Sequence, residues 1–481
     1  MNELQRKKLM DCFEEGQHGV VFVKGAGLMH RYGTDFEFPF RQESQFLYLT
    51  GVQEPDYAML IDLRSGEYHL FAPVRDVQYA VWHGKVSTME EIQRRYEPDF
   101  LHAADRVGEV IGEIGPDRIY VLDEEQAAWL REQGVRGGVS ATGEGAGAGT
   151  GAGAGAGAGT GAGAGAGTGT HGRFETTALV DALTDCRLIK TEDEIDKLRE
   201  AARVNNIAHR EVMKALRPGM YEYELKAVFE YHQQKHGLMQ PAYSGIHAGG
   251  VNSAILHYTD NNAPIRDGEL YLIDAGYEFD GYASDVTRTY PAAARFTARQ
   301  QQVYEAVLEA MERAIVGAVP GAKMEDLHLA AARAILEGLA DADVVRGDVD
   351  DMMELNVFAL FFPHGLGHFL GLDTHDVGGY PKGVDRIDRP GIRFLRARRD
   401  LQPGMVVTIE PGCYFIPALL KPALEDKEQR AFLNASLLQE MMEFGGVRIE
   451  DNLVITEDGH ENLTDVPKTV ADIEKLRKVA I

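Results

Sequence analysis

Several features that mark other classes of protein are scarce in this sequence. The 481 residues include only three cysteines, which lie too far apart in the sequence for a disulfide framework or a zinc knuckle. No apolar run approaches the ~18 residues of a membrane span, and the charged start MNELQRKKLM lacks the apolar core of a secretory signal. Basic residues number 49 against 75 acidic ones, so the basic footprint that nucleic acids and anionic membranes require is missing. We therefore expect a cytoplasmic protein with no nucleic-acid or membrane partner.

A low-complexity tract divides the chain. From about Gly143 to Thr170 the sequence is almost pure glycine and alanine with a few threonines, which is typical of a flexible linker or long loop. The pattern changes across this tract. We predict a smaller N-terminal α/β domain at 1–142, the linker or loop at 143–172 and a larger domain at 173–481. We assign no chemistry to the tract.

The segment before the tract shows no spacing typical of a catalytic cluster. YAMLIDL and EYHLFAP alternate apolar and polar residues on either side of Arg64-Ser65-Gly66, which predicts a β-hairpin. Residues 88–114 are charged and predict helix. The mixture indicates a small α/β domain.

The larger domain contains a faint internal repeat. Capping boxes that begin at Thr191 and Thr297 each open a helix that ends at a Pro-Gly pair. In both copies an acidic residue followed by leucine comes at the same distance after the Pro-Gly pair. In both copies a later glycine precedes a carboxylate by six residues. The matching residues are Pro218-Gly219 with Glu224-Leu225, Pro320-Gly321 with Asp326-Leu327, Gly268 with Asp274, and Gly404 with Glu410. Two helix–helix–strand halves predict a pseudo-symmetric α/β domain with its site between the halves.

Two acids lie on a second predicted hairpin, LYLIDAGYEFDGYASDVTRTY. Asp274 and Asp285 are 11 residues apart, so a turn centred between residues 279 and 280 would set them directly opposite each other. A strict Asp280-Gly281 turn would instead pair Asp274 with Thr287 and set Asp285 diagonally across, on the same face. In either register the carboxylates converge within about 5–8 Å, where one would protonate unless a cation lay between them.

Three further segments carry candidate ligands. PHGLGH places two histidines in a glycine-rich loop, where the backbone can approach a ligand closely. MVVTIEPG ends a strand at Glu410, and GGVRIEDN places Arg448, Glu450 and Asn452 on one face of a strand because side chains alternate. Four carboxylates and one imidazole are suited to two divalent ions, with Mn²⁺ the best match and Zn²⁺ or Co²⁺ as alternatives. No thiolate accompanies them, which disfavours a structural zinc site.

These residues, in this order and on these motifs, resemble the pita-bread metallopeptidases, the family of methionine aminopeptidase, aminopeptidase P and prolidase. The ligand positions are Asp274, Asp285, His368, Glu410 and Glu450. Longer segments on both sides of the tract, among them HRYGTDFEFPFRQESQFLYLTGVQEPDY and PHGLGHFLGLDTHDVGGYP, resemble the prolidase branch. The resemblance implies an α/β (α+β) chain, with a pseudo-symmetric pita-bread catalytic domain after a smaller creatinase-like N-terminal domain.

The resemblance also implies a role for each ligand. Asp274 would bind one metal ion, His368 and Glu410 would bind the other, and Asp285 and Glu450 would bridge both. A metal-bridging hydroxide at this dinuclear centre would attack the carbonyl that precedes proline. Glu410 would then carry the proton to the leaving nitrogen.

Three histidines are implied around the scissile bond. His257 and His375 would orient the substrate and stabilise the tetrahedral oxyanion. His364 would either share this role or hydrogen-bond a metal ligand.

Three more residues are implied in substrate binding. Arg396 would grip the terminal carboxylate of the substrate through its guanidinium fork. Arg448 would support the site from its strand, and Tyr243 would line the pocket or pack in the core.

The implied function is that of an Xaa-Pro dipeptidase, which in this family is usually a homodimer. Two alternatives stay open: an aminopeptidase P that removes the first residue from longer Xaa-Pro peptides, and a metal-free binding protein on the same fold. Arg396 favours the dipeptidase, because a carboxylate clamp directly after proline excludes longer chains. The complete set of five ligands disfavours the metal-free protein, since such relatives lose ligands.

Overall fold

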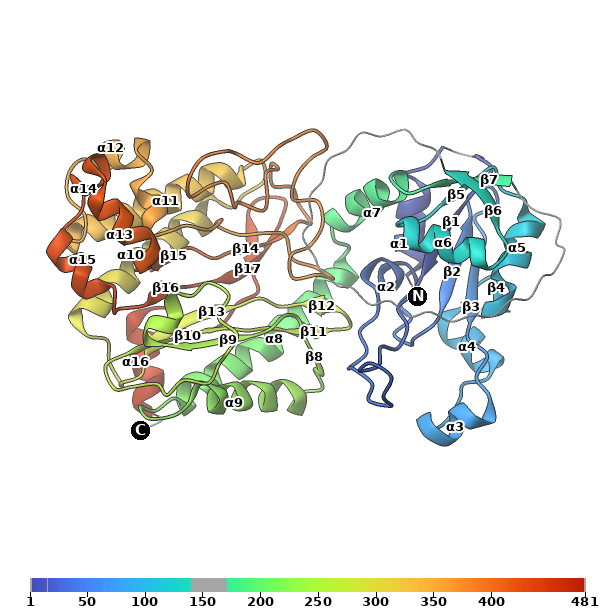
Figure 1. Cartoon of the computed structure of the whole chain (residues 1–481), viewed down its shortest axis with the longest axis horizontal. Helices are drawn as coiled ribbons and strands as arrows, with labels where there is room; N and C mark the ends of the chain where they lie inside the picture. The colour runs from blue at the N-terminus through green and yellow to red at the C-terminus, as the bar shows by residue number, and fades with distance from the viewer. Residues whose placement is uncertain (1, 15, 140–170, 480–481) are drawn as a thin grey trace. The chain divides into compact units, whose positions relative to one another are not determined.

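The computed structural model describes residues 2–14, 16–139 and 171–479. The chain divides into two compact units, Met1–Cys186 and Arg187–Ile481 (Figure 1). None of the described helices is both long and apolar enough to cross a membrane. The Gly-Ala segment expected to form a linker or loop lies outside the described residues, apart from its last two positions at 171 and 172.

The N-terminal unit is built on one mixed sheet with the strand order β4-β3-β2-β1-β5-β7-β6. Its strands are β1 (Gly19–Lys24), β2 (Ala58–Asp62), β3 (Tyr68–Ala72), β4 (Phe100–Ala103), β5 (Arg118–Tyr120), β6 (Arg136–Val139) and β7 (His171–Glu175). Its helices are α1 (Glu3–Met10), α2 (Ser44–Thr50), α3 (Val77–His83), α4 (Met89–Tyr96), η1 (Ala104–Arg106), α5 (Val107–Ile114), α6 (Glu124–Glu132) and α7 (Ala178–Leu188). Apolar side chains of β1 and β2 pack against α5 and α6 to form its core.

Two expectations for this unit need different answers. The hairpin around residues 64–66 is confirmed, because β2 and β3 pair antiparallel. The helix expected over 88–114 is confirmed at its two ends, in α4 and α5, and is wrong between them, where β4 pairs in parallel with β3. The local sequence did not predict this pairing, because it depends on β3, which lies about thirty positions earlier in the chain.

The unit boundary also lies later than the change in composition indicates. We expected the second domain to begin at residue 173, directly after the tract. Instead β7 pairs in parallel with both β5 and β6 of the N-terminal sheet. The tract therefore joins two strands of one sheet, and the second unit begins at Arg187.

The cysteines of this unit are closer in space than their sequence spacing suggests. The Sγ atoms of Cys12 and Cys186 lie 3.7 Å apart, although 174 positions separate them in the chain.

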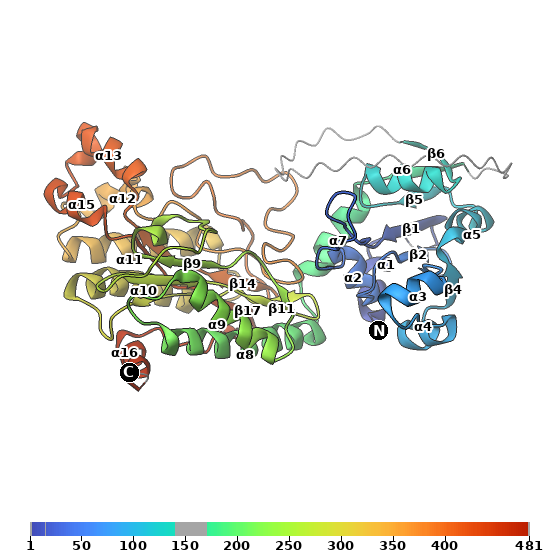
Figure 2. The same cartoon turned by 60° about the horizontal axis from the view of Figure 1, so that its bottom comes forward.

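The C-terminal unit consists of two helix pairs packed against short sheets (Figure 2). The helices are α8 (Glu192–Ala215), α9 (Glu222–Lys235), η2 (Gly250–Ala254), α10 (Ala298–Gly317), α11 (Met324–Asp341), α12 (Val349–Glu354), η3 (Val357–Leu360), α13 (Pro417–Glu425), α14 (Lys427–Arg430), α15 (Ala435–Met441) and α16 (Val470–Val479). The strands are β8 (Gln240–Pro241), β9 (Ile246–Gly249), β10 (Leu270–Asp274), β11 (Tyr277–Phe279), β12 (Tyr282–Ala283), β13 (Thr287–Pro291), β14 (Val406–Ile409), β15 (Gly412–Tyr414), β16 (Gly446–Arg448), β17 (Asp451–Ile455) and β18 (His460–Asn462).

The predicted repeat is visible in the backbone. Both capping boxes are present, and they open α8 and α10. The four glycines at matching offsets, Gly219, Gly321, Gly268 and Gly404, all have positive φ, between 81° and 91°. Only glycine adopts this conformation without strain, so the repeated turns explain why it recurs at these positions. In each half a left-handed glycine leads into a strand; β10 ends at Asp274, and β14 ends at Ile409, directly before Glu410.

The acidic hairpin adopts the second of the two registers considered. Phe279 pairs with Tyr282, and Asp274 pairs with Thr287. Asp280 and Gly281 both have positive φ, as a type I′ turn requires. Asp285 lies in the short break between β12 and β13, diagonally across from Asp274.

Candidate metal centre

The five candidate ligands, which span almost 180 positions in the chain, meet in one cavity of about 670 Å³ in the C-terminal unit. Ligand atoms of Asp285, His368 and Glu450 all lie within 4.8 Å of one another. The Nε2 atom of His368 is 3.4 Å from Oδ2 of Asp285 and 3.7 Å from Oε1 of Glu410. Asp274 completes the cluster from the end of β10.

Local hydrogen bonds fix the orientation of His368. Its Nδ1–H donates to the carbonyl of Phe369 at 3.0 Å, which leaves Nε2 directed at the acids. Its backbone N–H donates to Thr408 Oγ1 on β14. Burial alone would lower the pKa of His368, but the hydrogen bond from Nε2 to Asp285 and the charge of Glu410 raise it, which favours a proton on Nε2. A cation at the acids would take the place of that proton, and the neutral imidazole held in this way would be a competent metal ligand.

The acids carry more negative charge than the surrounding protein compensates. Burial, together with the neighbouring acids, raises the pKa of Glu450 well above its usual range, and burial raises that of Glu410 to about 7. Burial and the charge of Asp285 also raise the pKa of Asp274, against the effect of Arg448. In Asp285 burial is outweighed by the bond to His368, so its pKa is lowered.

One buried acceptor shows where a cation fits. Among the described residues, Oδ1 of Asp274 has no hydrogen-bond partner. A buried carboxylate oxygen without a donor is costly, and a bound cation removes that cost. The oxygen-rich donor set and this orphaned atom both fit divalent metal ions.

Arg448 connects the acidic cluster to a chain of hydrogen bonds. Its Nη2 donates to Oδ2 of Asp274 at 2.6 Å, and its Nη1 donates to the hydroxyl of Tyr414 at 2.7 Å. Tyr414 donates in turn to Nε2 of His364 at 2.8 Å, because Nδ1–H of His364 is used by the carbonyl of Gly365 at 2.8 Å. Burial lowers the pKa of His364 to about 3, so this imidazole stays neutral.

Tyr243 both lines the cavity and contacts a candidate ligand. Its hydroxyl donates to Oδ1 of Asp285 at 2.5 Å. Core packing, the alternative left open by the sequence, does not describe it.

The remaining candidates are exposed residues that line the cavity. His257 and His375 both line it, and the ring of His375 packs edge-on against that of His368 with 4.5 Å between centroids. Burial lowers the pKa of His375 to about 3. Next in the chain, Asp376 is fixed by buried ion pairs with Arg187 and Lys190, which hold this loop in place.

Arg396 is the one arginine of its segment that remains available at the cavity. Among the described residues, no hydrogen bond or ion pair occupies its guanidinium group, although it lines the cavity. Its neighbours are engaged elsewhere: Arg393 pairs with Asp388, Arg398 with Glu325, and Nε of Arg399 with a backbone carbonyl.

Sequence reasoning missed three residues that support the site. Tyr414 connects Arg448 to His364, Thr408 bonds the backbone of His368, and Thr287 bonds Glu450. Thr287 begins the strand that follows Asp285, Thr408 lies on the strand that precedes Glu410, and Tyr414 follows the EPG segment. Their positions were therefore visible in the sequence, but their contacts were not.

Comparisons with known proteins agree with this geometry. Residues 196–457 match the profile of metallopeptidase family M24, and residues 3–120 match the N-terminal domain of aminopeptidase P. The chain is 41% identical to the Xaa-Pro dipeptidase of Homo sapiens, over 95% of this chain and 88% of that protein. It is 34% identical to a probable Xaa-Pro aminopeptidase of Verticillium alfalfae, over 96% and 92% of the two chains.

Solved structures show the same fold. Aminopeptidase PepP of Pseudomonas aeruginosa superposes with a TM-score of 0.80 and 33% identity, covering 100% of this chain and 98% of that one. Zinc-substituted aminopeptidase P of Escherichia coli, in complex with product, gives a TM-score of 0.81 and 30% identity over the same shares. The chain therefore belongs to metallopeptidase family M24. It is a metal-dependent hydrolase with a pita-bread C-terminal domain and an aminopeptidase P-type N-terminal domain.

Proposed function

We propose that this protein is an Xaa-Pro dipeptidase, which cleaves dipeptides with a C-terminal proline. The observation that carries the proposal is a single cavity lined by both the five-ligand cluster and the available guanidinium group of Arg396. The ligand cluster can activate water, and Arg396 can fix a substrate carboxylate at a set distance from that water. The high identity to Xaa-Pro dipeptidases over nearly the whole chain supports the same substrate class.

We assign the ligands as the resemblance implies. Asp274 would hold one ion, His368 and Glu410 would hold the other, and Asp285 and Glu450 would be shared between them. Two divalent ions held by these residues would supply the Lewis acidity that makes a bound water acidic and polarises a carbonyl oxygen. We propose Mn²⁺ as the natural metal, because oxygen ligands dominate the set.

The protein's own groups bind the substrate and move the proton. Oε1 of Glu410 lies 3.7 Å from His368 and its Oε2 lies 3.9 Å from His364, so its carboxylate faces the cavity between two imidazoles. From there Glu410 takes the proton of the attacking water and delivers it to the proline nitrogen. His257 and His375, which line the same cavity, orient the scissile carbonyl and donate to its oxygen as charge develops.

Arg396 decides between the two peptidase alternatives. A guanidinium group that binds the proline carboxylate leaves no room for a further residue, which selects dipeptides. The similarity to aminopeptidase P structures keeps the second alternative in view. The composition and the family resemblance further support a homodimer in the cytoplasm.

A substrate panel tests the proposal. Purified full-length protein is incubated with Gly-Pro, Ala-Pro and Arg-Pro-Pro, in the presence of Mn²⁺, Zn²⁺, Co²⁺ or a chelator. We expect hydrolysis of both dipeptides, little cleavage of the tripeptide, loss of activity with the chelator and the strongest recovery with Mn²⁺. Cleavage of the tripeptide alone would show an aminopeptidase P. A protein that neither binds nor needs a divalent ion would support the metal-free alternative.

A further inference from the structure

We propose that Thr287 and Asn452 are positioning residues that hold the two shared carboxylates in place, each acting across the boundary between the halves. Asn452 fixes Asp285, and Thr287 fixes Glu450. The inference rests on the proposed function, because it concerns how the dinuclear centre keeps its shape.

Asn452 supplies the backbone of Asp285 with the partner that a neighbouring strand would otherwise provide. The N–H of Asp285 donates to Oδ1 of Asn452 at 3.0 Å, and Nδ2 of Asn452 donates back to the carbonyl of Asp285. Asp285 lies in the break between β12 and β13, outside the ladders of the described strands. The carboxamide therefore satisfies both backbone polar groups of Asp285.

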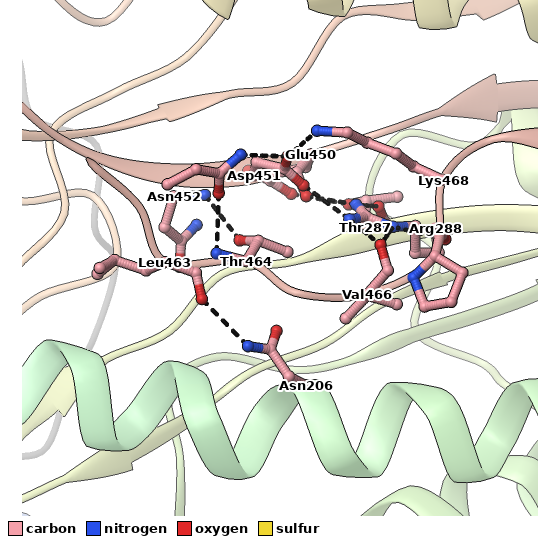
Figure 3. Close-up of polar contacts among 12 residues, drawn as sticks. Asn206, Thr287, Arg288, Glu450, Asp451, Asn452, Leu463, Thr464, Val466 and Lys468 are labelled. Atoms are coloured by element: carbon pink, nitrogen blue, oxygen red, sulfur yellow. Dashed lines mark hydrogen bonds and ion pairs between the residues drawn. The ribbon is translucent and has the colours of Figure 1, made fainter. Parts of the chain in front are cut away.

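Asn452 is itself held firmly. It pairs with Thr408 in the ladder between β14 and β17, and its backbone N–H donates to Oγ1 of Thr464 at 3.0 Å (Figure 3). Its side chain is buried. Because its position is fixed by the second half of the unit, it transmits that position to a ligand of the first half.

Thr287 performs the converse task. Its hydroxyl donates to Oε2 of Glu450 at 2.7 Å. Nε of Arg448 donates to the same hydroxyl oxygen at 3.3 Å, which directs the single hydroxyl proton toward Glu450.

The backbones of these two residues are also joined. The N–H of Glu450 donates to the carbonyl of Thr287 at 3.0 Å, and Nη1 of Arg288 donates to both carbonyls, at 2.9 Å to that of Thr287 and 2.7 Å to that of Glu450 (Figure 3).

The two arrangements follow one rule. In each half, the shared ligand is followed two residues later by the side chain that holds the ligand of the other half. Residues two apart along extended backbone point to the same side, which explains the spacing. Asp285 with Thr287 and Glu450 with Asn452 thus form a reciprocal pair, and loosening either contact displaces a carboxylate that both ions share.

Metal affinity tests the inference apart from activity. Metal-free full-length protein is titrated with Mn²⁺ by calorimetry, for wild type, Thr287→Val, Thr287→Ser and Asn452→Leu. Supporting residues of metal ligands typically contribute about 10–100-fold to affinity, so we expect Thr287→Val and Asn452→Leu to raise Kd by that factor and Thr287→Ser to stay within about threefold of wild type. Rescue by serine would show that the hydroxyl, and not the volume of the side chain, is responsible.

Two matched controls remove buried hydrogen bonds elsewhere. The hydroxyl of Thr50 donates to the backbone carbonyl of Phe46 at 2.7 Å. The carboxamide of Asn206 donates to the backbone carbonyl of Leu463 at 3.1 Å. Thr50→Val and Asn206→Leu should leave the Mn²⁺ affinity unchanged.

The outcomes separate this inference from the proposed function. Folded Thr287→Val that binds Mn²⁺ as tightly as wild type would overturn the inference while the proposed function stands, and this variant decides the case even if Asn452→Leu does not fold. A weakening of the controls equal to that of Thr287→Val would also overturn it, by showing a general loss of stability. Wild-type protein that binds no Mn²⁺, Zn²⁺ or Co²⁺ would overturn both.

Discussion

Two adjacent acids of the C-terminal unit lie in opposite electrostatic surroundings. Glu450 faces the cavity, where three other acids gather, and burial together with their charge raises its pKa well above its usual range. Asp451 faces the other way, where Arg288 at 2.7 Å and Lys468 at 2.5 Å outweigh the effect of burial and lower its pKa (Figure 3). The alternation of side chains along the chain that leads into β17 is enough to separate the two.

The difference shows which charges the protein balances by itself. Asp451 belongs to a closed ion network that contributes to the fold. Glu450 belongs to a cluster whose excess negative charge needs a cation from outside. An unbalanced charge in a buried site is typical of a functional site, because it destabilises the fold unless a ligand compensates it.

Substitution of Glu450, the acid whose charge the protein does not balance, should have the largest effect on activity. We expect Glu450→Gln to lower kcat/KM for Gly-Pro by roughly 1,000-fold or more, equivalent to about 4 kcal/mol, because the variant loses a charged ligand that both ions share. The melting temperature of the metal-free protein should not fall, since one of four mutually repelling acids is gone. Asp285→Asn is the matched variant for activity. A fully metallated and active protein in either case would contradict the bridging role.

Substitution of Asp451, the acid whose charge the protein balances, should instead lower the stability of the metal-free protein. Asp451→Asn leaves the buried Arg288 and the half-buried Lys468 without their acid, and we expect the free energy of unfolding to fall by about 3–5 kcal/mol. Urea denaturation of the metal-free protein measures this change. Asp350→Asn, which breaks an exposed ion pair with Arg333, is the control, with an expected cost of about 0–1 kcal/mol. Equal stability of Asp451→Asn and Asp350→Asn would show that the ion pairs of Asp451 do not stabilise the fold more than an exposed pair does.

The available guanidinium of Arg396 provides a smaller test on the same cavity. A charged hydrogen bond contributes about 1.5–3 kcal/mol, so Arg396→Ala should raise KM for Gly-Pro by roughly 10–100-fold with little change in kcat. Gly-Pro amide, which lacks the carboxylate, should be affected much less. Arg393→Ala is the control, because Arg393 already pairs with Asp388. Unchanged kinetics in Arg396→Ala would assign the clamp to another residue.

A second balanced acid extends the comparison to pH. Burial alone would raise the pKa of Asp376, but Lys190 and Arg187 lower it. A lowered folded pKa gives stability that is present above the unfolded value of about 3.9 and lost as the pH falls through the folded value. The stability difference between wild type and Asp376→Asn should therefore be constant between about pH 5 and 8 and close at lower pH, by at most ~1.4 kcal/mol per pH unit. A difference that does not narrow between pH 5 and pH 3 would show that packing, not charge, is responsible.

Local chemistry in the sequence predicted the acidic hairpin well. Asp280-Gly281 favours a type I′ turn, and that turn alone sets the register that pairs Asp274 with Thr287. The alternation of side chains likewise placed Arg448, Glu450 and Asn452 on the side of the site, where all three make contacts. These features depend on neighbouring residues, which the sequence displays directly.

Features that depend on distant pairing were not predictable in the same way. Strand β7 follows the Gly-Ala tract, so composition assigned it to the second domain, whereas its ladder partners lie in the first. Strand β4 lies within a charged, helix-like segment and is extended because β3 offers it an edge. The bridge from Arg448 through Tyr414 to His364 joins three distant segments, and no spacing distinguishes such a tyrosine from one packed in a core.

The two shared ligands come from segments that are far apart in the chain, because Asp285 lies in the first half of the C-terminal unit and Glu450 in the second. On the assignment proposed here, a chain still being synthesised holds Asp274 and Asp285 before Glu450 and Asn452 have been added. Such an unfinished chain cannot assemble the reactive centre. The order of the ligands along the chain therefore keeps the reactive centre from forming until both halves of the C-terminal unit have been made.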